Sequence, residues 1–290
     1  MMVLKASKLV VALCCGLITA CQSAASLTPV EAPAALPQGY ELSWQDEFDR
    51  EGRPDHRKWS FDTRGNQHRW WNGELQYYTR NDLRNAYVQN GYLHIEALKG
   101  APDVTPEGGY AGQQYTSARL VTRGKQSWTG GFFEIRARVP CAYGTWPAIW
   151  LLGHEYPGNY WPNAGEIDIL EHVGQKPKVL HAAVHTKNFN HRLDTQRNAQ
   201  RKLPTACENF HRYQLLWTED KISIGVDDEF YFELENDGTG KGSWPFDEPQ
   251  YMILNLAIGG WGGNNKNKLA RTSFPQRFEV DYVRVFQPID

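Results

Sequence analysis

Hydrophobic and polar residues alternate with a period of two in short segments throughout the chain after residue 40. The alternation is clear in segments 92–97, 131–139, 221–226 and 278–285, and it is typical of strands that bury one face. Gly, Asn, Asp and Pro separate these segments, and no stretch of fifteen residues carries a convincing 3.6-residue stripe. The pattern predicts an all-β domain, either an antiparallel sandwich or a barrel.

The first 20 residues follow a different pattern. Lys5 and Lys8 precede an apolar run, and small residues follow it, as in a secretory signal. The run is too short to span a bilayer comfortably. The sequence Ile18-Thr19-Ala20-Cys21 resembles a bacterial lipobox, which implies cleavage before Cys21 and acylation of that cysteine. Ordinary secretion, with Cys21 inside the cleavage region, is the alternative.

A lipid on Cys21 would be the only membrane contact of the mature protein. Gln22 follows the cysteine, which by resemblance favours the outer membrane. Residues 21–39 are rich in Ala, Pro and Ser and are expected to form a flexible tether. Residues 40–290 then remain as one domain, which is the size that all-β sandwiches reach.

The cysteines allow one disulfide. Two of the five, Cys14 and Cys15, leave with the signal, and Cys21 would carry the lipid. Cys141 and Cys207 remain as a pair in an exported protein, where disulfides persist. We expect a bridge between them; two unpaired buried thiols are the alternative.

Composition excludes some partners. The chain of 290 residues holds 31 Lys+Arg and 33 Asp+Glu, a formal charge of −2, and it carries no basic stripe for a nucleic acid and no acidic tail. It is rich in aromatic residues, with 11 Trp and 14 Tyr. These rings either fill an unusually aromatic core or line a binding site.

Three carboxylates fall within six residues of the segment 165–172. On a strand, Glu166 and Asp168 share one face, and strict alternation would turn Glu171 toward the opposite, apolar face. An extra residue at Leu170, accommodated as a β-bulge, returns Glu171 to the face of the other two. On a helix, Glu166 and Glu171 would lie about 140° apart. We therefore expect a bulged strand.

This arrangement permits glycosidase chemistry. The two glutamates would lie about 13 Å apart along the strand, and inward-leaning side chains could bring the carboxyl groups to about 5–5.5 Å, the spacing of a retaining glycosidase. Asp168 between them could raise the proton affinity of one glutamate and orient the other. A solvated strand face and a calcium site are the alternatives. Trp146, Trp150 and Trp161 flank the acids, and flat indoles suit the faces of a pyranose.

Segments 144–153 and 161–171 together resemble glycoside hydrolase family 16, in its laminarinase-like branch. Further similar segments are 44–49, 72–79, 115–120, 255–260 and 278–285. The resemblance covers residues 40 to 287. It implies a β-jelly-roll sandwich of two antiparallel sheets with a concave substrate cleft, and an endo-acting retaining mechanism that needs no cofactor.

The resemblance also implies roles for individual residues. Glu166 would be the nucleophile, Asp168 the assisting carboxylate and Glu171 the general acid/base. The implied sugar contacts are Asn72, Arg119, Trp146, Trp150, Trp161, His185 and Trp261. Arg119 has the alternative of a surface ion pair, and Trp150 that of pointing into the core.

His181 and His185 are four residues apart, a spacing that on a helix could hold zinc. Their segment 179–185 reads as a strand, so we expect no zinc there. The resemblance places His185 beside the cleft, and His181 has the alternative of a buried, hydrogen-bonded histidine.

A structural calcium ion on the convex face is a further implication of the resemblance. The matching positions are Glu47, Gly91 and Asp281, and oxygen ligands suit such a hard cation. The alternative is that Glu47 and Asp281 are ordinary surface charges. No catalytic role is expected for this ion.

The substrate is predicted less sharply than the fold. Segment 184–196 departs from the familiar laminarinases and could close one end of the cleft. We expect a monomer that acts on a neutral polysaccharide, a β-1,3 or mixed β-1,3-1,4 glucan such as laminarin. The alternatives are a β-galactoside-containing glycan, such as a marine galactan or a mucin-type O-glycan, and a non-catalytic glycan-binding β-sandwich.

Overall fold

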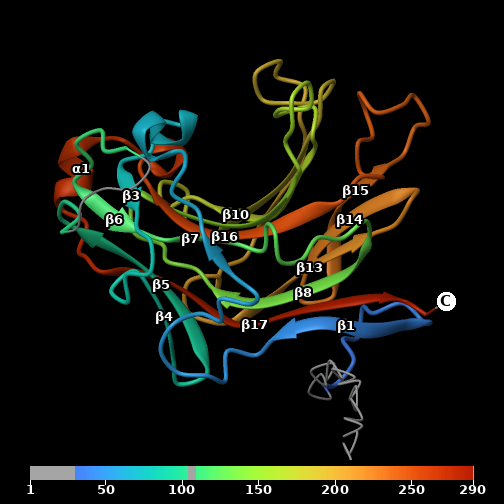
Figure 1. Cartoon of the computed structure of the whole chain (residues 1–290), viewed down its shortest axis with the longest axis horizontal. Coiled ribbons are helices and arrows are strands. Elements are labelled where there is room, and N and C mark those ends of the chain that lie inside the picture. The colour runs from blue at the N-terminus through green and yellow to red at the C-terminus, as the bar shows by residue number, and fades with distance from the viewer. Residues whose placement is uncertain (1–29, 104–108, 290) are drawn as a thin grey trace, which may run out of the picture.

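The computed structural model describes residues 30–103 and 109–289. Two large sheets pack face to face, as Figure 1 shows. The predicted signal, Cys21 and the first part of the tether lie outside the described residues. No helix in the described part of the chain is long and apolar enough to cross a membrane.

The outer sheet has ten strands. Their order is β15 (Glu229–Glu235), β14 (Lys221–Val226), β13 (His211–Trp217), β8 (Gly131–Arg138), β17 (Gln276–Pro288), β5 (Tyr92–Lys99), β6 (Tyr115–Ser117) and β3 (Gln76–Tyr78), with β1 (Tyr40–Asp46) paired to β17 and β4 (Ala86–Gln89) paired to β5. All these pairs are antiparallel except β3 with β6. The predicted antiparallel arrangement is therefore confirmed, with this one short pair as a parallel exception.

The second sheet has seven strands, all antiparallel, and we call it the cleft sheet because a cleft lies over it. Their order is β12 (Arg197–Lys202), β11 (Val179–His185), β10 (Glu166–His172), β9 (Thr145–Gly153), β16 (Gln250–Ile258), β7 (Arg119–Val121) and β2 (Ser60–Phe61). The helical elements are short: η1 (Asn66–Trp71), η2 (Gly260–Gly262) and α1 (Lys266–Ala270). The all-β sandwich predicted from the alternation is confirmed.

The core lies between the two sheets and follows the alternation of the strands. On β9, Ile149 and Leu151 are fully buried, whereas Trp146 and Trp150 on the other face are only partly buried. Each fully buried aliphatic side chain of this kind contributes roughly 1.5–3 kcal/mol. The inward residues thus hold the sandwich together and leave the opposite face of the cleft sheet available for a site.

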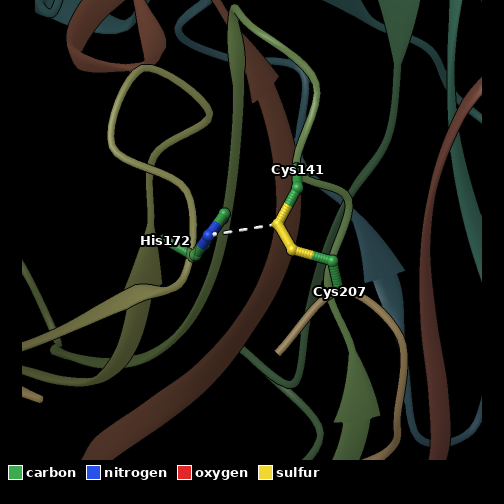
Figure 2. Close-up of side chains that lie close together, drawn as sticks. All are labelled: Cys141, His172 and Cys207. Carbon is green, nitrogen blue, oxygen red and sulfur yellow. Dashed lines mark hydrogen bonds between the residues drawn. A yellow bond between two sulfur atoms is a disulfide. The ribbon is translucent and has the colours of Figure 1, made fainter. Parts of the chain in front are cut away.

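The Cys141–Cys207 disulfide is present, as expected. It joins the loop after β8 to the loop before β13 across a separation of 66 residues, for which chain entropy predicts about 4 kcal/mol of stabilisation. Figure 2 shows His172, the last residue of β10, with its Nε2 3.5 Å from Cys141 Sγ. The backbone amide of Lys178 donates to the same Nε2 at 3.1 Å.

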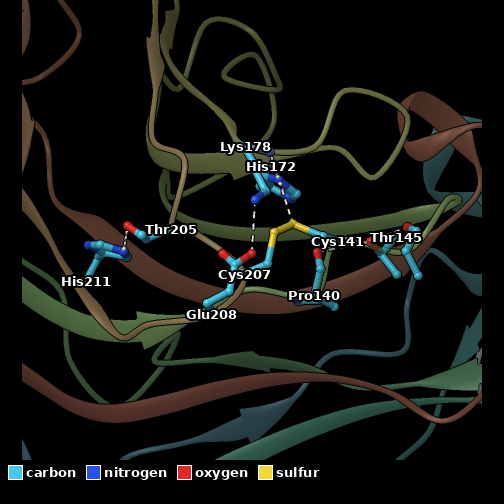
Figure 3. The surroundings of a disulfide bond; sticks show 10 residues. Pro140, Cys141, Thr145, His172, Lys178, Thr205, Cys207, Glu208 and His211 are labelled. Atoms are coloured by element: carbon cyan, nitrogen blue, oxygen red, sulfur yellow. Dashed lines mark hydrogen bonds and ion pairs between the residues drawn. A yellow bond between two sulfur atoms is a disulfide. The ribbon is translucent and has the colours of Figure 1, made fainter.

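The surroundings of this bridge tie further loops together. In Figure 3 the Lys178 ammonium lies 3.0 Å from the Glu208 carboxylate, beside the disulfide. The disulfide and its neighbours therefore fix the carboxyl end of β10, the strand that carries the three acids.

The residues expected to bind calcium are engaged in other contacts. Both carboxylate oxygens of Glu47 accept hydrogen bonds of 2.8 Å from Arg284, and Asp281 pairs with Arg136. Gly91 lies in the turn between β4 and β5. A guanidinium partner on each carboxylate does not fit a donor set for a hard cation.

Candidate active site

A bulge in β10 determines where its acidic side chains point. Toward β9 the register shifts between Asp168 and Leu170, which leaves Ile169 without a partner residue. Toward β11 it shifts between Asp168 and Glu171. The predicted bulge is confirmed: Ile169 is unpaired toward β9, and both Ile169 and Leu170 are unpaired toward β11. As a result Glu166, Asp168 and Glu171 all line the same cleft.

Each of the two glutamates is held by an indole. Trp161 Nε1 donates to Glu166 Oε2 at 3.1 Å, and Trp146 Nε1 donates to Glu171 Oε1 at 3.0 Å. An indole N–H is a donor only and carries no charge. These bonds therefore orient the carboxyl groups without placing a permanent cation beside them.

Asp168 lies between the glutamates and faces His185. His185 Nε2 is 3.4 Å from Asp168 Oδ2 and 3.7 Å from Glu166 Oε1. Asp168 is buried, and its Oδ2 has no hydrogen-bond partner among the described residues. A buried acceptor without a partner is costly, which indicates that this oxygen is kept for an interaction that another protonation state or a bound ligand supplies.

Burial raises the pKa of Glu166, Asp168 and Glu171 to about 8 each, and the charge of Asp168 adds to the rise at both glutamates. Carboxyl groups this close titrate as a coupled set. Only Glu166 and Asp168 lie within ion-pair distance of His185 among the described residues. The electrostatic effect of His185 acts to lower the pKa of both glutamates, and burial outweighs it at each of them.

The cleft has a volume of about 560 Å³ and lies across the middle of the cleft sheet. Alternate residues of β9 and β16 form its floor: Trp146, Ala148, Trp150, Leu152, Asn255 and Ala257. Five of the seven predicted sugar contacts line it, namely Asn72, Arg119, Trp146, Trp150 and Trp161.

Arg119 and Trp150 resolve the alternatives left open by the sequence. Arg119 is buried, with its guanidinium 4.4 Å from the Trp70 ring and 4.6 Å from the Trp150 ring. Its Nε lies 3.6 Å from Asp62. Trp150 donates to Asn255 Oδ1 at 2.8 Å and faces the cleft. Neither a surface ion pair nor a core tryptophan describes these residues.

The other two predicted sugar contacts, His185 and Trp261, do not line the cleft. His185 lies within 3.7 Å of Glu166 and 3.4 Å of Asp168, so its position suits orientation of Asp168. Trp261 packs edge-on against Trp146 at 5.8 Å and against His181 at 4.6 Å. His181 is buried, and its Nε2 has no partner among the described residues, so the hydrogen-bonded alternative is wrong for that atom.

Side chains that could hold a metal gather in two groups within the described residues: Cys141, His172 and Cys207, and Glu166, Asp168 and His185. The sulfurs of the first group are bonded to each other. The second consists of the candidate catalytic groups themselves. His181 and His185 do not form such a group.

The sequence did not single out Glu74 as a residue of the cleft, and it placed Trp70 and Trp71 only beside the predicted contact Asn72. Glu74 is buried, and burial raises its pKa to about 7. It accepts hydrogen bonds from Asn72 at 3.2 Å and from Gln76 at 2.5 Å. Its place two residues after Asn72, in a segment already tied to the family, was the available signal. Trp70 and Trp71 also line the cleft.

The segment 184–196 reaches the cleft, as expected. It connects β11 with β12 and brings His191 and Arg192 to the lining. The Arg192 guanidinium lies 4.5 Å from the Trp161 ring, and the His191 ring lies 4.9 Å from it. The loop therefore closes one wall of the cleft beside Glu166.

Known proteins are similar to this chain in sequence and in architecture. The sequence profile of "Glycosyl hydrolases family 16" matches residues 75–284. A beta-glucanase of Rhodothermus marinus is 49% identical over 259 residues, which are 87% of this chain and 86% of that protein. The laminarinase structure from the same organism superposes with a TM-score of 0.78 at 47% identity, covering 87% of this chain and 98% of that one.

A second solved structure is even closer in shape. It is a Glu-to-Ser mutant of a non-specific endo-beta-1,3(4)-glucanase with an oligosaccharide at its active site, and it superposes with a TM-score of 0.81 at 42% identity, covering 90% of this chain and all of that one.

Proposed function

The chain belongs to glycosyl hydrolase family 16, and from this premise we propose that it is a retaining endo-glycosidase that cleaves internal β-1,3 and mixed β-1,3-1,4 bonds of glucans such as laminarin. The observation that carries the proposal is the bulge in β10. It brings Glu166 and Glu171 to one face of the cleft, where each carboxyl group is held by a separate indole N–H.

The two glutamates divide the chemistry between them. The Glu166 carboxylate attacks the anomeric carbon while Glu171 protonates the departing glycosidic oxygen, and a covalent glycosyl ester on Glu166 forms. Glu171, now ionised, then takes a proton from a water molecule that attacks the same carbon, and Glu166 is released. The anomeric configuration is retained because two inversions occur.

Asp168 and His185 act as positioning residues. Asp168 raises the pKa of both glutamates, which helps to keep Glu171 protonated before attack. When negative charge leaves Glu166 on forming the ester, the proton affinity of Glu171 falls, and Glu171 can act as the base. His185 Nε2 lies 3.4 Å from Asp168 Oδ2, and this contact suits a role in orienting that carboxyl.

The lining of the cleft suits a neutral polysaccharide. Trp146, Trp150 and Trp161 offer apolar ring surface, and Asn72 and Asn255 offer amide groups for hydroxyls. The acids of β10 and the arginines of the lining occur on the same surface, so no strong field of a single sign develops. The near-zero net charge of the chain agrees with such a substrate.

Replacement of the nucleophile tests the proposal. We expect Glu166→Ser to abolish release of reducing ends from laminarin and barley β-glucan while the circular dichroism spectrum stays unchanged. The matched control is Glu219→Ser, at an exposed glutamate between β13 and β14, which should retain full activity. Full activity of Glu166→Ser would refute the assignment. Wild-type protein that binds these glucans without cleaving them would favour the glycan-binding alternative.

We further propose that the protein is a monomeric lipoprotein, held at the outer membrane by lipid on Cys21 and by the tether that follows. The basic start, the apolar run and the lipobox-like sequence support this. In a bacterial host, Cys21→Ser should move the protein from the membrane fraction to the soluble periplasmic fraction. Retention of that variant in the membrane fraction would contradict the anchor.

A further inference from the structure

Trp71 is the most exposed large hydrophobic side chain in the described part of the molecule, with 69% of its surface accessible. Single exposed hydrophobic residues are common and need no explanation by themselves. Trp71 differs because it lines the rim of the cleft. One face of its ring stacks on His68, at 4.9 Å between centroids and 22° between planes.

The backbone that presents this ring is strained. Arg69, Trp70 and Trp71 have φ values of 48°, 50° and 56°, so three consecutive residues with side chains occupy the left-handed region. That region is unfavourable for every residue with a Cβ, and most of all for bulky ones. Such strain persists only where the surrounding structure enforces it, and it gathers at functional sites.

The surrounding contacts that enforce the strain centre on Trp70. Its ring packs on Gly65, where a Cβ would come within 2.6 Å of the indole. Its Nε1 donates to Asn66 Oδ1 at 3.1 Å, and the Arg119 guanidinium covers one of its faces at 4.4 Å. Arg69 donates to the carbonyl of Ala111 at 3.1 Å. Trp70 is thus fixed to the floor of the cleft, while Trp71 is turned to the rim.

The turn that presents Trp71 is anchored on the β7 side of the cleft sheet. Because Trp70 packs on Arg119 of β7, the turn lies over the β7 side of the cleft sheet, and β16 and β9 separate β7 from β10. Three interstrand spacings are about 14 Å. In Figure 1 the cyan segment around η1 and the yellow-green loops beside β10 rise from the same side of this sheet at opposite ends.

We propose that Trp71 is a distal sugar-binding platform, which stacks a neutral β-linked hexose of the polysaccharide several sugar units from the cleaved bond. This inference rests on the proposed glucanase function and adds to it a preference for long chains. A contact made equally in the bound substrate and in the transition state lowers KM without changing kcat. Short substrates that do not reach β7 gain nothing from it.

Chain-length dependence of the kinetics tests this platform. Trp71→Ala should raise KM for laminarin about five- to tenfold, the size expected for one lost aromatic contact, with kcat unchanged. For a trisaccharide, kcat/KM should change less than twofold. Trp71→Phe should keep most of the affinity. Equal losses on laminarin and trisaccharide, or an unchanged KM for laminarin, would overturn the proposal.

Two control variants distinguish the effect of losing the Trp71 ring from the effect of relieving the backbone strain and from that of losing any exposed aromatic ring. Trp71→Gly relieves the left-handed strain and also removes the ring, so it should be more stable than Trp71→Ala but equally poor in KM. If the strain itself promoted activity, the two variants would differ in kcat. Tyr156→Ala removes an aromatic ring that is 55% exposed and lies outside the cleft. It should leave both constants unchanged.

A binding measurement distinguishes failure of this inference from failure of the proposed function. The inactive Glu166→Ser variant should be retarded by laminarin in a native gel. In the double variant Glu166→Ser/Trp71→Ala, the apparent Kd for laminarin should be about five- to tenfold higher. Wild-type protein that does not cleave glucans would refute the function alone. Retardation unaffected by Trp71→Ala would refute the platform alone.

Discussion

The carboxylates on the two outward-facing surfaces of the sandwich have different kinds of partner. On the outer sheet, Glu96 pairs with Arg277, and Glu279 pairs with Arg138. In the cleft, the two glutamates of β10 are held by indole N–H groups and by a histidine contact, without an arginine among their ion-pair partners in the described residues.

This difference explains why one face is structural and the other reactive. An arginine is permanently charged and holds its partner carboxyl in the ionised form, which stabilises a sheet but prevents proton transfer. Neutral donors leave the carboxyl free to gain and lose a proton near neutral pH. The raised pKa values of the three β10 acids result from burial without a permanent cation.

Loss of the proton donor in the cleft is expected to have the largest effect on the rate of hydrolysis. Glu171→Ala should lower the rate on laminarin by about 10²–10⁴-fold, the usual contribution of a general acid/base. Azide should partly restore turnover of a substrate with an activated leaving group, and the product should be a glycosyl azide of retained configuration, detected by mass spectrometry and NMR. Absence of any azide product would argue against Glu171 as the acid/base. Glu279→Ala on the outer sheet should leave kcat unchanged.

An intermediate effect is expected when an outer carboxylate loses its arginine. Arg284→Ala removes the bidentate partner of Glu47, and the side chain of Arg284 is only 16% exposed. We expect the free energy of unfolding to fall by about 2 kcal/mol, between the values for surface and fully buried pairs. Thermal unfolding should then begin about 4–8 °C lower, with unchanged kcat at 25 °C. A lowered kcat at equal folded fraction would show that the two faces are coupled.

The smallest expected effect is a gain in thermal stability when Glu171 of the cleft is replaced by glutamine, and this gain depends on pH. The folded state raises the pKa of Glu171 to about 8, so this group favours folding fully below its unfolded pKa of about 4.5, and that contribution is lost as pH rises through 8. Glu171→Gln should therefore melt at the same temperature as wild type at pH 4 and a few degrees higher at pH 8. The outer-face counterpart Glu279→Gln should melt lower at pH 8. A lower melting temperature for Glu171→Gln at pH 8 would contradict the comparison.

The sequence predicted the fold and the catalytic strand well because both depend on local alternation. The period of two located β5, β8, β14 and β17, and the spacing of the acids required a bulge in β10 that the structure contains. Toward β9 the unpaired residue is Ile169 rather than the predicted Leu170, and both residues are apolar and buried. Composition at these positions does not distinguish which of the two is unpaired.

Features that depend on partners distant in sequence could not be predicted as well. His185 contacts Asp168, and Trp261 packs edge-on against Trp146, so each lies next to a lining residue without lining the cleft itself. The calcium expectation did not include Arg284 and Arg136, which reach Glu47 and Asp281 through strand pairing. The left-handed turn at Arg69–Trp71 contains no glycine, so no local signal announced it.

The bulge in β10 makes Glu166 the nucleophile of a retaining pair. The most direct measurement is incubation with a 2-deoxy-2-fluoro-β-laminaribiosyl fluoride, which slows hydrolysis of a glycosyl-enzyme ester, followed by proteolysis and mass spectrometric sequencing. We predict one fluorosugar per chain, attached to Glu166, and none in the Glu166→Ser variant. Attachment to Asp168 or Glu171, or turnover without any covalent adduct, would contradict the account.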